Sequence, residues 1–421
     1  MRQWVYPLTV KGKYRDIRRW VGYALQAFLL VVPWITVGGH PAAQFDLVSR
    51  RAFVLGYVFT PRDTIFLVLA GLSAAFTLFF FTALFGRLWC GYACPQTVFL
   101  EEWVRPVETF FEGDRGARIA RDRKGWVWDV IWRKAAKWSV FLGMSVVVAM
   151  TATSWFTGAW PLWSGSAGSG AYVVVGVLSM VMFFDFAWFR EQFCNYLCPY
   201  ARFQGALADD GSLVVAYDEG AGEPRRKGGR CIGCEKCVVV CPQGIDIRQG
   251  FQLECISCAS CVDACESVMS KRGEPSLITY KALEPRPLVR PRTVAYAGLL
   301  GLLATAAIVM FANKGELEAT VARAPGTLYT VDGDGWIRNT FLLRVSNDSL
   351  HAVDVTVVAQ LDAAELLVPP VHVAPAGSAM APVVVRIPPD AAHGDRTLPL
   401  HFTVTAGDAS VDLTTTFKSG G

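Results

Sequence analysis

The chain alternates long apolar stretches with polar segments, and this pattern predicts membrane-spanning helices. About 20 mostly apolar residues in a row can cross the hydrocarbon core of a bilayer as a helix. Five stretches meet this criterion, at 20–37, 64–86, 138–160, 171–189 and 293–312. Trp and Tyr residues gather at the ends of several of them, as they do at membrane–water interfaces. We therefore predict an α-helical bundle of five transmembrane spans.

The last hundred residues follow a different period. From about residue 320, apolar and polar residues alternate in five short runs, TFLLRVSN, AVDVTVVAQL, APVVVRIP, LPLHFTVTA and SVDLTTTF. Clusters of Pro, Gly, Asn and Asp separate these runs, which is typical of short strands joined by turns. We predict an all-β, immunoglobulin-like sandwich over 313–421. It contains no Cys pair, so its likeness to immunoglobulin domains is one of architecture.

These patterns divide the chain into four parts. Residues 1–206 form a membrane region with four of the spans, 207–292 form a polar insert, 293–312 form the fifth span, and 313–421 form the sandwich. The insert contains the Gly- and charge-rich stretch DEGAGEPRRKGGR, which we interpret as a loop. The predicted fold class is thus a multi-domain membrane protein with a helical bundle, an insert and an all-β C-terminal domain.

The distribution of Lys and Arg predicts the orientation, because cytoplasmic loops are enriched in these residues. Residues 1–19 carry six of them, 87–137 carry ten and 190–292 carry fourteen, whereas 38–63 carry three and 161–170 carry none. The first three segments are therefore expected in the cytoplasm. Five spans then place the C-terminal sandwich on the opposite side, which in a bacterial inner membrane is the periplasm.

Composition narrows the class of protein further. Apolar residues make up 52% of the chain and charged residues 18%, against about 25% charged residues in typical soluble domains. A wholly soluble or largely disordered chain is therefore excluded. The net charge of +4 is too small to argue for nucleic acid, so no nucleic-acid partner is expected.

Twelve cysteines carry the clearest chemical signal. They are bunched at regular spacings between residues 90 and 265, and none lies in the last 156 residues. A secreted disulfide scaffold would spread its cysteines through the exported part of the chain. The distribution instead favours metal binding by reduced thiols at the cytoplasmic face.

Eight of these cysteines form two copies of one motif, C-x2-C-x2-C-x3-C, over 231–241 and 255–265. This is the run of bacterial two-cluster ferredoxins, in which the fourth cysteine of each copy ligates the cluster of the other. The first 4Fe–4S cluster is therefore assigned to Cys231, Cys234, Cys237 and Cys265, and the second to Cys255, Cys258, Cys261 and Cys241. A zinc module is the alternative, but a doubled motif without His fits zinc poorly.

The remaining four cysteines form two C-x3-C-P motifs, Cys90–Cys94 in WCGYACPQ and Cys194–Cys198 in FCNYLCPYARFQ. They stand where the second and fourth predicted spans end, so all four thiols could meet. In a helix, residues i and i+4 share one face, and the following proline would break that helix. Such a site could hold Cu(I), zinc or an iron–sulfur cluster. A redox-active disulfide and buried structural cysteines are the alternatives.

The segments WCGYACPQTVFLE, REQFCNYLCPYARFQ, CPQGIDIR and ECISCASCVDAC resemble the membrane polyferredoxins called FixG, RdxA or CcoG, which are cytochrome c oxidase accessory proteins. The resemblance covers nearly the whole chain. It implies a role in assembling the cbb-type haem–copper oxidase, through reduction of Cu(II) to Cu(I), with two 4Fe–4S clusters as cofactors. It also implies that the copper-handling or further redox residues are Cys90, Cys94, Cys194 and Cys198.

The same resemblance suggests partners and leaves two other functions open. The implied partners are the lipid bilayer, a cytoplasmic electron donor, copper ions or a copper chaperone or transporter, and components of oxidase assembly. The related NapH and NosR proteins share the motifs, so a general electron conduit to quinone or to a periplasmic reductase is one alternative. The other is a redox-sensing scaffold for oxidase assembly. No dinucleotide-binding or Walker motif is present, so the electron donor must come from elsewhere.

Two further features are weighed here. Asp185 lies within the fourth span, where an acid is a candidate functional residue, although Arg190 near the cytoplasmic end could pair with it. A basic run at Arg225, Arg226, Lys227 and Arg230 precedes the ferredoxin motifs. It could attract an acidic electron donor or anionic headgroups, or simply be a solvated loop.

Overall fold

The computed structural model describes residues 4–60, 63–201, 203, 211–282, 289–312, 314–315, 317–326, 328–349, 351–375, 377–392 and 397–419. The chain forms two compact units. The first contains Met1–Trp34 and Phe66–Ala306, and the second contains Ile35–Ile65 and Ala307–Gly421. The predicted boundary at 206–207 lies outside the described residues.

Four helices of the described chain are long and apolar enough to cross a membrane: α2 (Thr64–Phe85), α7 (Trp128–Thr157), α9 (Ser169–Phe184) with its continuation η4 (Asp185–Phe189), and α14 (Pro291–Ala312). They confirm four of the five predicted stretches as helices. The most apolar windows of α2 and α14 are not buried inside the protein at all. Because such helices expose apolar side chains all round, their surroundings must be apolar, as lipid is.

The first predicted stretch, 20–37, forms a helix in a shifted position. Helix α1 (Lys13–Val31) begins earlier in the chain and ends in the short 3-10 turn η1 (Val32–Trp34). Its first turns are charged, and it is not among the four helices above. A tertiary contact explains the early start: Asp263 accepts the backbone N–H groups of Tyr14 and Arg15 at 3.1 and 2.8 Å. A carboxylate at a helix N-terminus satisfies orphan N–H groups and the helix dipole.

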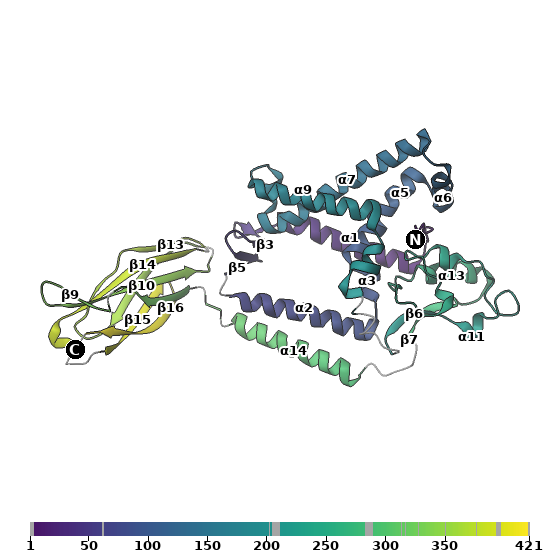
Figure 1. Cartoon of the computed structure of the whole chain (residues 1–421). Helices are drawn as coiled ribbons and strands as arrows, with labels where there is room; N and C mark the ends of the chain where they lie inside the picture. The colour runs from purple at the N-terminus through teal and green to yellow at the C-terminus, as the bar shows by residue number, and fades with distance from the viewer. Residues whose placement is uncertain are drawn as a thin grey trace. The chain divides into compact units, whose positions relative to one another are not determined.

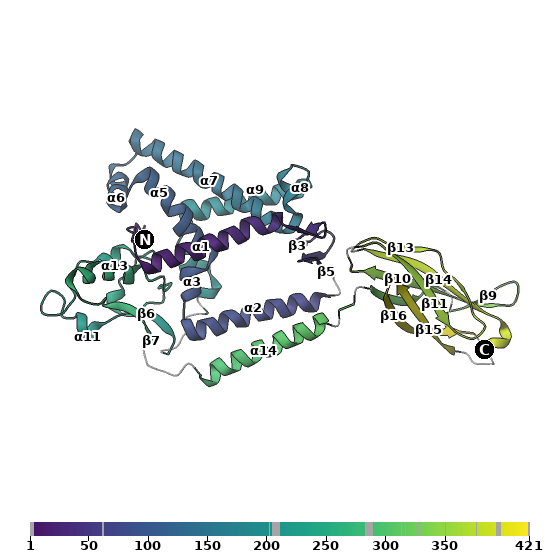
Figure 2. The ribbon, with the colours of Figure 1, turned by 180° about the vertical axis from the view of Figure 1, so that it is seen from behind.

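The helices of the first unit meet in a small apolar core. Helices α7 and α9 lie side by side in both views of the ribbon, and so do α2 and α14 (Figures 1 and 2). Phe99 at the end of α4 and Val104 at the end of η3 are buried against Phe141 of α7 and Phe186 of η4. The segment that follows the first C-x3-C motif is therefore fixed against the helix that precedes the second. The shorter elements of this part are α3 (Leu88–Tyr92), α4 (Pro95–Phe99), η3 (Leu100–Val104), α5 (Arg105–Glu112), α6 (Arg115–Lys124), α8 (Ala159–Trp163) and η5 (Phe193–Leu197).

The cysteine-rich insert also belongs to the first unit. Its strands β6 (Leu213–Tyr217) and β7 (Ile278–Ala282) pair antiparallel and bring the two ends of the insert together. Between them, α12 (Lys236–Val239) and α13 (Ser260–Met269) carry the cysteine motifs, and side chains such as Val215, Ile247 and Met269 form the core. The described N-terminal segment contacts the insert: Leu8 N–H bonds to Val239 O at 2.8 Å, and the start of α1 lies near α13 in both views (Figures 1 and 2). The shorter elements are α11 (Glu219–Gly222), η6 (Ile247–Gln249) and η7 (Ser270–Arg272).

The second unit contains the predicted sandwich. One sheet has the strand order β12-β14-β10-β8, with β9 paired to β10, and the other has the order β13-β11-β15-β16. Phe341, Phe402 and Phe417 are fully buried between the sheets. The strands are β8 (Leu317–Arg323), β9 (Thr330–Val331), β10 (Ile337–Asn347), β11 (Val353–Gln360), β12 (Glu365–Leu367), β13 (Val371–Val373), β14 (Ser378–Ile387), β15 (Thr397–Ala406) and β16 (Ala409–Lys418).

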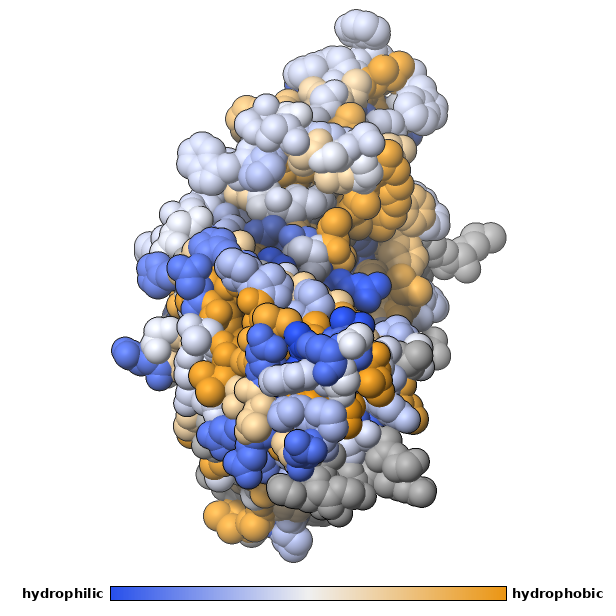
Figure 3. Space-filling model, turned by 90° about the vertical axis from the view of Figure 1, so that its left-hand side faces the viewer, coloured by the Kyte–Doolittle hydropathy of each residue, from blue (hydrophilic) through white to orange (hydrophobic). Residues whose placement is uncertain are grey.

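The five alternating runs in the sequence correspond to the five long strands β10, β11, β14, β15 and β16, which confirms the prediction of a β-sandwich. The five runs do not include β8, although its seven residues LEATVAR also alternate, nor β9, β12 and β13, which are too short to show a period with two or three residues each. On the face that Figure 3 shows, hydrophilic residues are scattered among hydrophobic ones.

Residues 35–65 add two small sheets, formed by β1 (Thr36–Val37), β2 (His40–Pro41), β3 (Ala43–Asp46), β4 (Arg51–Val54) and β5 (Tyr57–Phe59).

Candidate metal centres

Two cavities in the insert are each ringed by four cysteines. The first, of about 30 Å³, is lined by Cys231, Cys234, Cys237 and Cys265. The second, of about 20 Å³, is lined by Cys241, Cys255, Cys258 and Cys261, with Cys237 also at its edge. The chain thus gathers the fourth cysteine of each motif with the first three of the other. This is the grouping that the spacing predicts.

The backbone explains how three cysteines of one motif face the same cavity. In each motif two residues adopt positive φ angles, Gly233 and Glu235 in the first copy and Ser257 and Ala259 in the second. Three of these four are not glycine, and such residues rarely adopt this conformation outside strained, functional loops. The left-handed turns curl the chain around the cavity. A helix then begins, so the third cysteine lies in its first turn.

The donor chemistry of both cavities fits a 4Fe–4S cluster. All the cysteines that line them are free thiols, and thiolates are the usual ligands of such clusters. Among the described residues, no three His, Cys, Asp or Glu side chains converge on a point that would hold a single metal ion. Burial raises the pKa of Cys237 and Cys241 to about 12 and that of Cys255 to about 11. Four thiolates in one cavity therefore need a cationic centre to be stable.

The first C-x3-C motif spans a break between two helices. Cys90 lies in α3, which ends at Tyr92, and Cys94 precedes α4 as its N-cap with Pro95 in the first helical position. The break lies where the proline predicts it. One continuous helix through both thiols, which would have placed them on one face, is not observed.

The second C-x3-C motif overlaps the second of two π-helical turns, η4 and η5. Arg190 N–H bonds to Asp185 O at the end of η4, and Cys198 N–H bonds to Phe193 O at the end of η5. Cys194 lies within η5, and Cys198 ends it in an extended conformation before Pro199. Wide turns of this kind are rare and are found most often at functional sites. They change the direction in which the thiols point relative to an ordinary helix.

The structure brings the four C-x3-C thiols into one neighbourhood. Burial is the largest cause that raises the pKa of Cys194, and the thiols of Cys94, Cys90 and Cys198 raise it further. Burial also raises the pKa of Cys94, with Cys198 contributing. Such mutual effects act only over short distances. The other three thiols of the two motifs therefore lie near Cys194, and we call these four thiols the four-thiol site. Among the described residues they do not converge on one point that would hold a single metal ion.

The four-thiol site touches the loop of the second cysteine cavity. Cys90 is buried in a cluster with Ile256 and Cys258. Next to it, Gly91 allows a close approach, because a Cβ at this position would lie 2.6 Å from Ile256 O and 2.9 Å from Cys258 Cα. Only glycine fits such a contact between two backbones. The two kinds of thiol site are thus in direct contact.

Arg87, like Gly91, is a residue of the site that the sequence analysis did not identify. It is buried, and its guanidinium donates to Ala201 O at 2.8 Å and to Cys255 O at 3.4 Å. It therefore ties the end of α2 to the segment after Cys198 and to the second ferredoxin motif. In the sequence it stands at the edge of an apolar span, where a basic residue has an ordinary explanation as a flanking charge.

The predicted pair of Asp185 and Arg190 is not formed. Gln96 Nε2 donates to both carboxylate oxygens of Asp185, at 3.0 and 2.8 Å, and to Arg190 O at 3.0 Å. The guanidinium of Arg190 instead lies 2.7 Å from Glu108 Oε2. The positive φ of 54° at Arg190 turns its side chain away from the helix that carries Asp185. Asp185 thereby holds the segment directly after Cys94, a function in positioning that the sequence could not show.

The basic run is largely engaged within the insert. Arg225 Nε lies 2.6 Å from Glu223 Oε1, and Arg230 Nε lies 2.8 Å from Glu274 Oε2. Arg226 donates to Gly233 O at 2.8 Å, beside the first cysteine cavity. These contacts make the run a structural part of the insert.

Comparison with protein families supports the assignment of the cysteine motifs. A family model described as a 4Fe–4S dicluster domain matches residues 189–230 and 224–283, and one described as a 4Fe–4S binding domain matches residues 67–112. A model of the immunoglobulin-like fold at the C-terminus of FixG matches residues 307–420. The matches at 67–112 and 189–230 contain the two C-x3-C motifs.

Several proteins resemble the chain over most of its length. Protein RdxA of Cereibacter sphaeroides is 35% identical over 82% of this chain and 80% of its own. Protein RdxB of the same organism is 35% identical over 86% and 83%. Nitrogen fixation protein FixG of Rhizobium meliloti is 32% identical over 82% and 77%. A crystal structure of a FixG-related protein from Vibrio parahaemolyticus aligns with 25% of this chain and 97% of its own, at 17% identity and a TM-score of 0.23.

Proposed function

Because the chain belongs to the FixG and RdxA family, we propose that this membrane iron–sulfur protein reduces Cu(II) to Cu(I) for assembly of the cbb-type cytochrome c oxidase. One observation carries the proposal. Cys90 of the four-thiol site packs against Ile256 and Cys258 in the loop of the second cysteine cavity. A site of soft ligands thus lies in contact with a site suited to one-electron chemistry.

The residues present define what each site contributes. When bound, 4Fe–4S clusters on the two cysteine cavities supply electrons one at a time. Cu(II) must gain one electron to become Cu(I), and no atom or proton needs to be transferred. Thiolates are soft ligands that select Cu(I), so the four-thiol site favours the reduced ion once it forms. Cys90 is only 8% exposed, which limits the access of water to that ion.

We further propose five spans, with the N-terminus, the 87–137 loop and the ferredoxin insert in the cytoplasm and the sandwich in the periplasm. Contacts of the N-terminal segment support a span at α1, in addition to the four long apolar helices. Leu8 N–H bonds to Val239 O at 2.8 Å, and Arg15 Nη1 lies 2.7 Å from Glu102 Oε1. The start of α1 therefore lies with the insert and with the 87–137 loop. If α2 crosses the membrane to reach that loop, α1 must cross first to bring the chain to the far side.

Cu(II) reduction can be tested on the whole protein in detergent under anaerobic conditions. The protein is reduced with dithionite, the excess is removed, and stoichiometric Cu(II) is added in the presence of a Cu(I) chelator. Wild type should regain the visible absorbance of oxidised clusters while the chelator reports Cu(I). The variant in which Cys90, Cys94, Cys194 and Cys198 are all Ser should do neither at a comparable rate. Thr151→Ser, a change of similar size in α7, serves as the matched control.

The outcome separates the proposal from its alternatives. Equal rates in wild type and the four-Ser variant, with equal cluster content, would mean that copper attacks the clusters unaided and would overturn the proposal. A variant that lacks the eight ferredoxin cysteines addresses the scaffold function. A scaffold should still support oxidase assembly in cells, whereas a reductase should not.

One observation favours a second candidate, a general electron conduit in which the four thiols hold a further iron–sulfur cluster. The 4Fe–4S binding domain matched at 67–112 includes Cys90 and Cys94. Iron analysis distinguishes the two, since two clusters require about eight iron atoms per chain and three require about twelve. About twelve atoms, falling to about eight in the four-Ser variant, would favour the conduit over copper binding.

A further inference from the structure

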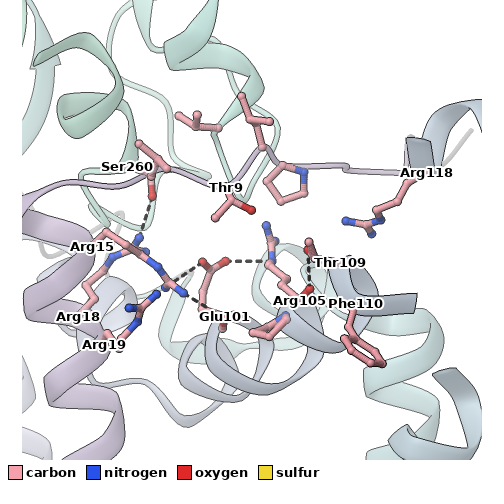
Figure 4. Close-up of a pocket in the computed structure, with 15 residues that line it drawn as sticks. Thr9, Arg15, Arg18, Arg19, Glu101, Arg105, Thr109, Phe110, Arg118 and Ser260 are labelled. Atoms are coloured by element: carbon pink, nitrogen blue, oxygen red, sulfur yellow. Dashed lines mark hydrogen bonds and ion pairs between the residues drawn. The ribbon is translucent and has the colours of Figure 1, made fainter. Parts of the chain in front are cut away.

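A large pocket lies where the N-terminal segment, α1, α5 and the insert meet, and Ser260 in its lining also lines the second cysteine cavity. Its volume is about 430 Å³, within the range of about 300–1,000 Å³ typical of ligand sites. Its charged side chains point into it from two sides, as Figure 4 shows, with Thr9 of the N-terminal segment between them. We call it the arginine pocket, and its charged lining residues are Arg15, Arg18, Arg19, Glu101, Arg105 and Arg118.

The arginine pocket has more positive than negative charge. Arg118 belongs to a neighbouring cluster, where its Nη2 lies 2.6 Å from Glu108 Oε2. The other four arginines share two carboxylates. Arg15 Nη1 lies 2.7 Å from Glu102 Oε1, and Arg105 Nε lies 2.9 Å from Glu101 Oε1. Four guanidinium groups against Glu101 and Glu102 leave an excess of two positive charges among these side chains, and Arg18 also lies near a thiol of the second cavity, Cys258.

Arg18 is the least compensated of these arginines. Only 4% of its surface is exposed, and among the described residues its side chain donates one hydrogen bond, from Nη2 to the neutral Ser260 Oγ at 2.8 Å. Within the part of the chain that the structure describes, its Nε and Nη1 are buried without a hydrogen-bond acceptor. Burial of a guanidinium whose N–H groups lack acceptors costs free energy unless an anion pairs with it. Such a side chain lining a pocket is therefore arranged for a ligand.

We propose that the arginine pocket binds a phosphate group. Guanidinium forks match the oxygens of phosphate through paired, charge-assisted hydrogen bonds. The excess of two positive charges suits a phosphate monoester, which carries up to two negative charges, and also suffices for the single charge of a phospholipid phosphodiester. The phosphate comes either from a soluble phosphorylated molecule or from a phospholipid headgroup. Phe110 in the lining is 81% exposed, an apolar surface that an acyl chain could cover.

The experiment uses the purified full chain with its clusters in a phosphate-free, non-phospholipid detergent. Inorganic phosphate is titrated by calorimetry at low ionic strength. Phospholipid retained from the membrane is measured on the same preparations by native mass spectrometry. The test variants are Arg18→Gln and Arg19→Gln. Position 19 tolerates substitution more readily than position 18. Arg272→Gln, which removes an exposed charge from the same insert, is the matched control.

Wild type and Arg272→Gln should bind inorganic phosphate or retain phospholipid to the same degree. Arg18→Gln should weaken the affinity about tenfold or more, because one or two charge-assisted hydrogen bonds are lost. Phospholipid retention that falls in the variants identifies a headgroup as the source, whereas phosphate affinity alone identifies a soluble molecule. Absorbance of the clusters verifies that each variant has folded. The proposal is wrong if Arg18→Gln and Arg19→Gln both match the control in phosphate affinity and in phospholipid retention.

Discussion

A Cβ added at Gly91 would lie 2.9 Å from the Cα of Cys258, so the two backbones are in contact between the four-thiol site and the second cysteine cavity. This contact fixes the spacing of the two sites through backbone atoms, which cannot rotate away as side chains do. It explains why a glycine follows Cys90 directly.

Gly91→Ala tests that contact. The added methyl group must push the loop at Ile256–Cys258 away, so we expect a loss of about 1–3 kcal/mol in stability, as overpacking causes elsewhere. Cu(II)-dependent oxidation of the clusters should slow, with the iron content unchanged. The control is Gly143→Ala in α7, where a Cβ meets no atom within 4 Å. A Gly91→Ala variant as stable and as fast as the control would show that the contact has no function.

Pairs of cysteine substitutions test which thiols share a cluster. Cys241→Ser with Cys261→Ser changes one cavity only, so the variant should keep the other cluster and about four iron atoms per chain. Cys241→Ser with Cys231→Ser changes both cavities and should lower the iron content of the insert towards zero. If the four cysteines of each motif instead held one cluster, the first double variant would lose both clusters and the second would keep one.

Arg18 should affect the reduction potential of the second cluster. Its Nη2 donates to Ser260 Oγ at 2.8 Å, and Cys258 Sγ lies 3.6 Å from the same oxygen. A positive charge there stabilises the reduced, more negative state of the cluster. Arg18→Gln should therefore lower the midpoint potential measured by redox titration, while Arg272→Gln leaves it unchanged. An unchanged or higher potential in Arg18→Gln would contradict this prediction.

Glu108 organises a buried ion network whose effect on stability depends on pH. Its Oε2 lies 2.6 Å from Arg118 Nη2 and 2.7 Å from Arg190 Nη2. Burial alone would raise the pKa of Glu108, but Arg190, Arg118 and Lys137 hold it below its ordinary value. A carboxyl with a depressed pKa contributes stability above its unfolded pKa and loses it only as the pH falls through the folded pKa.

Glu108→Gln should therefore destabilise the protein by about 3–5 kcal/mol, because it leaves buried arginines without their counter-ion. The difference in thermal midpoint from wild type should stay constant between about pH 8 and 5, since Glu108 remains ionised throughout that range. Glu365→Gln, at an exposed ion pair of the sandwich, is the control and should cost less than about 1 kcal/mol. A difference that shrinks towards pH 5 would mean that the pKa of Glu108 is raised.

The sequence predicted those elements whose signal is local. Four apolar runs became long helices, five alternating runs became the long strands of the sandwich, and the cysteine spacing gave the grouping of thiols around two cavities. Each of these follows from a periodicity or a spacing in one segment of chain. The short strands β9 and β12 lacked such a signal, because two or three residues are too few to show a period.

The start of α1 shows why the remainder could not be predicted. The apolar run begins near residue 20, yet the helix begins at Lys13 because Asp263, some 250 residues away in sequence, caps it. Asp185 was likewise expected to pair with the nearby Arg190, and Gln96 from another segment takes that place. Partners that are distant in sequence leave no local pattern.

The sequence by itself determined the chemistry of this protein: which residues are thiols, how they are spaced, and which segments are apolar enough to enter lipid. Those properties depend on residue type and on distance along the chain. The tertiary structure alone decided that Cys90 lies against Cys258, that Arg87 joins three segments, and that five arginines and Glu101 line one pocket. Such relations arise only when folding brings distant segments within contact distance.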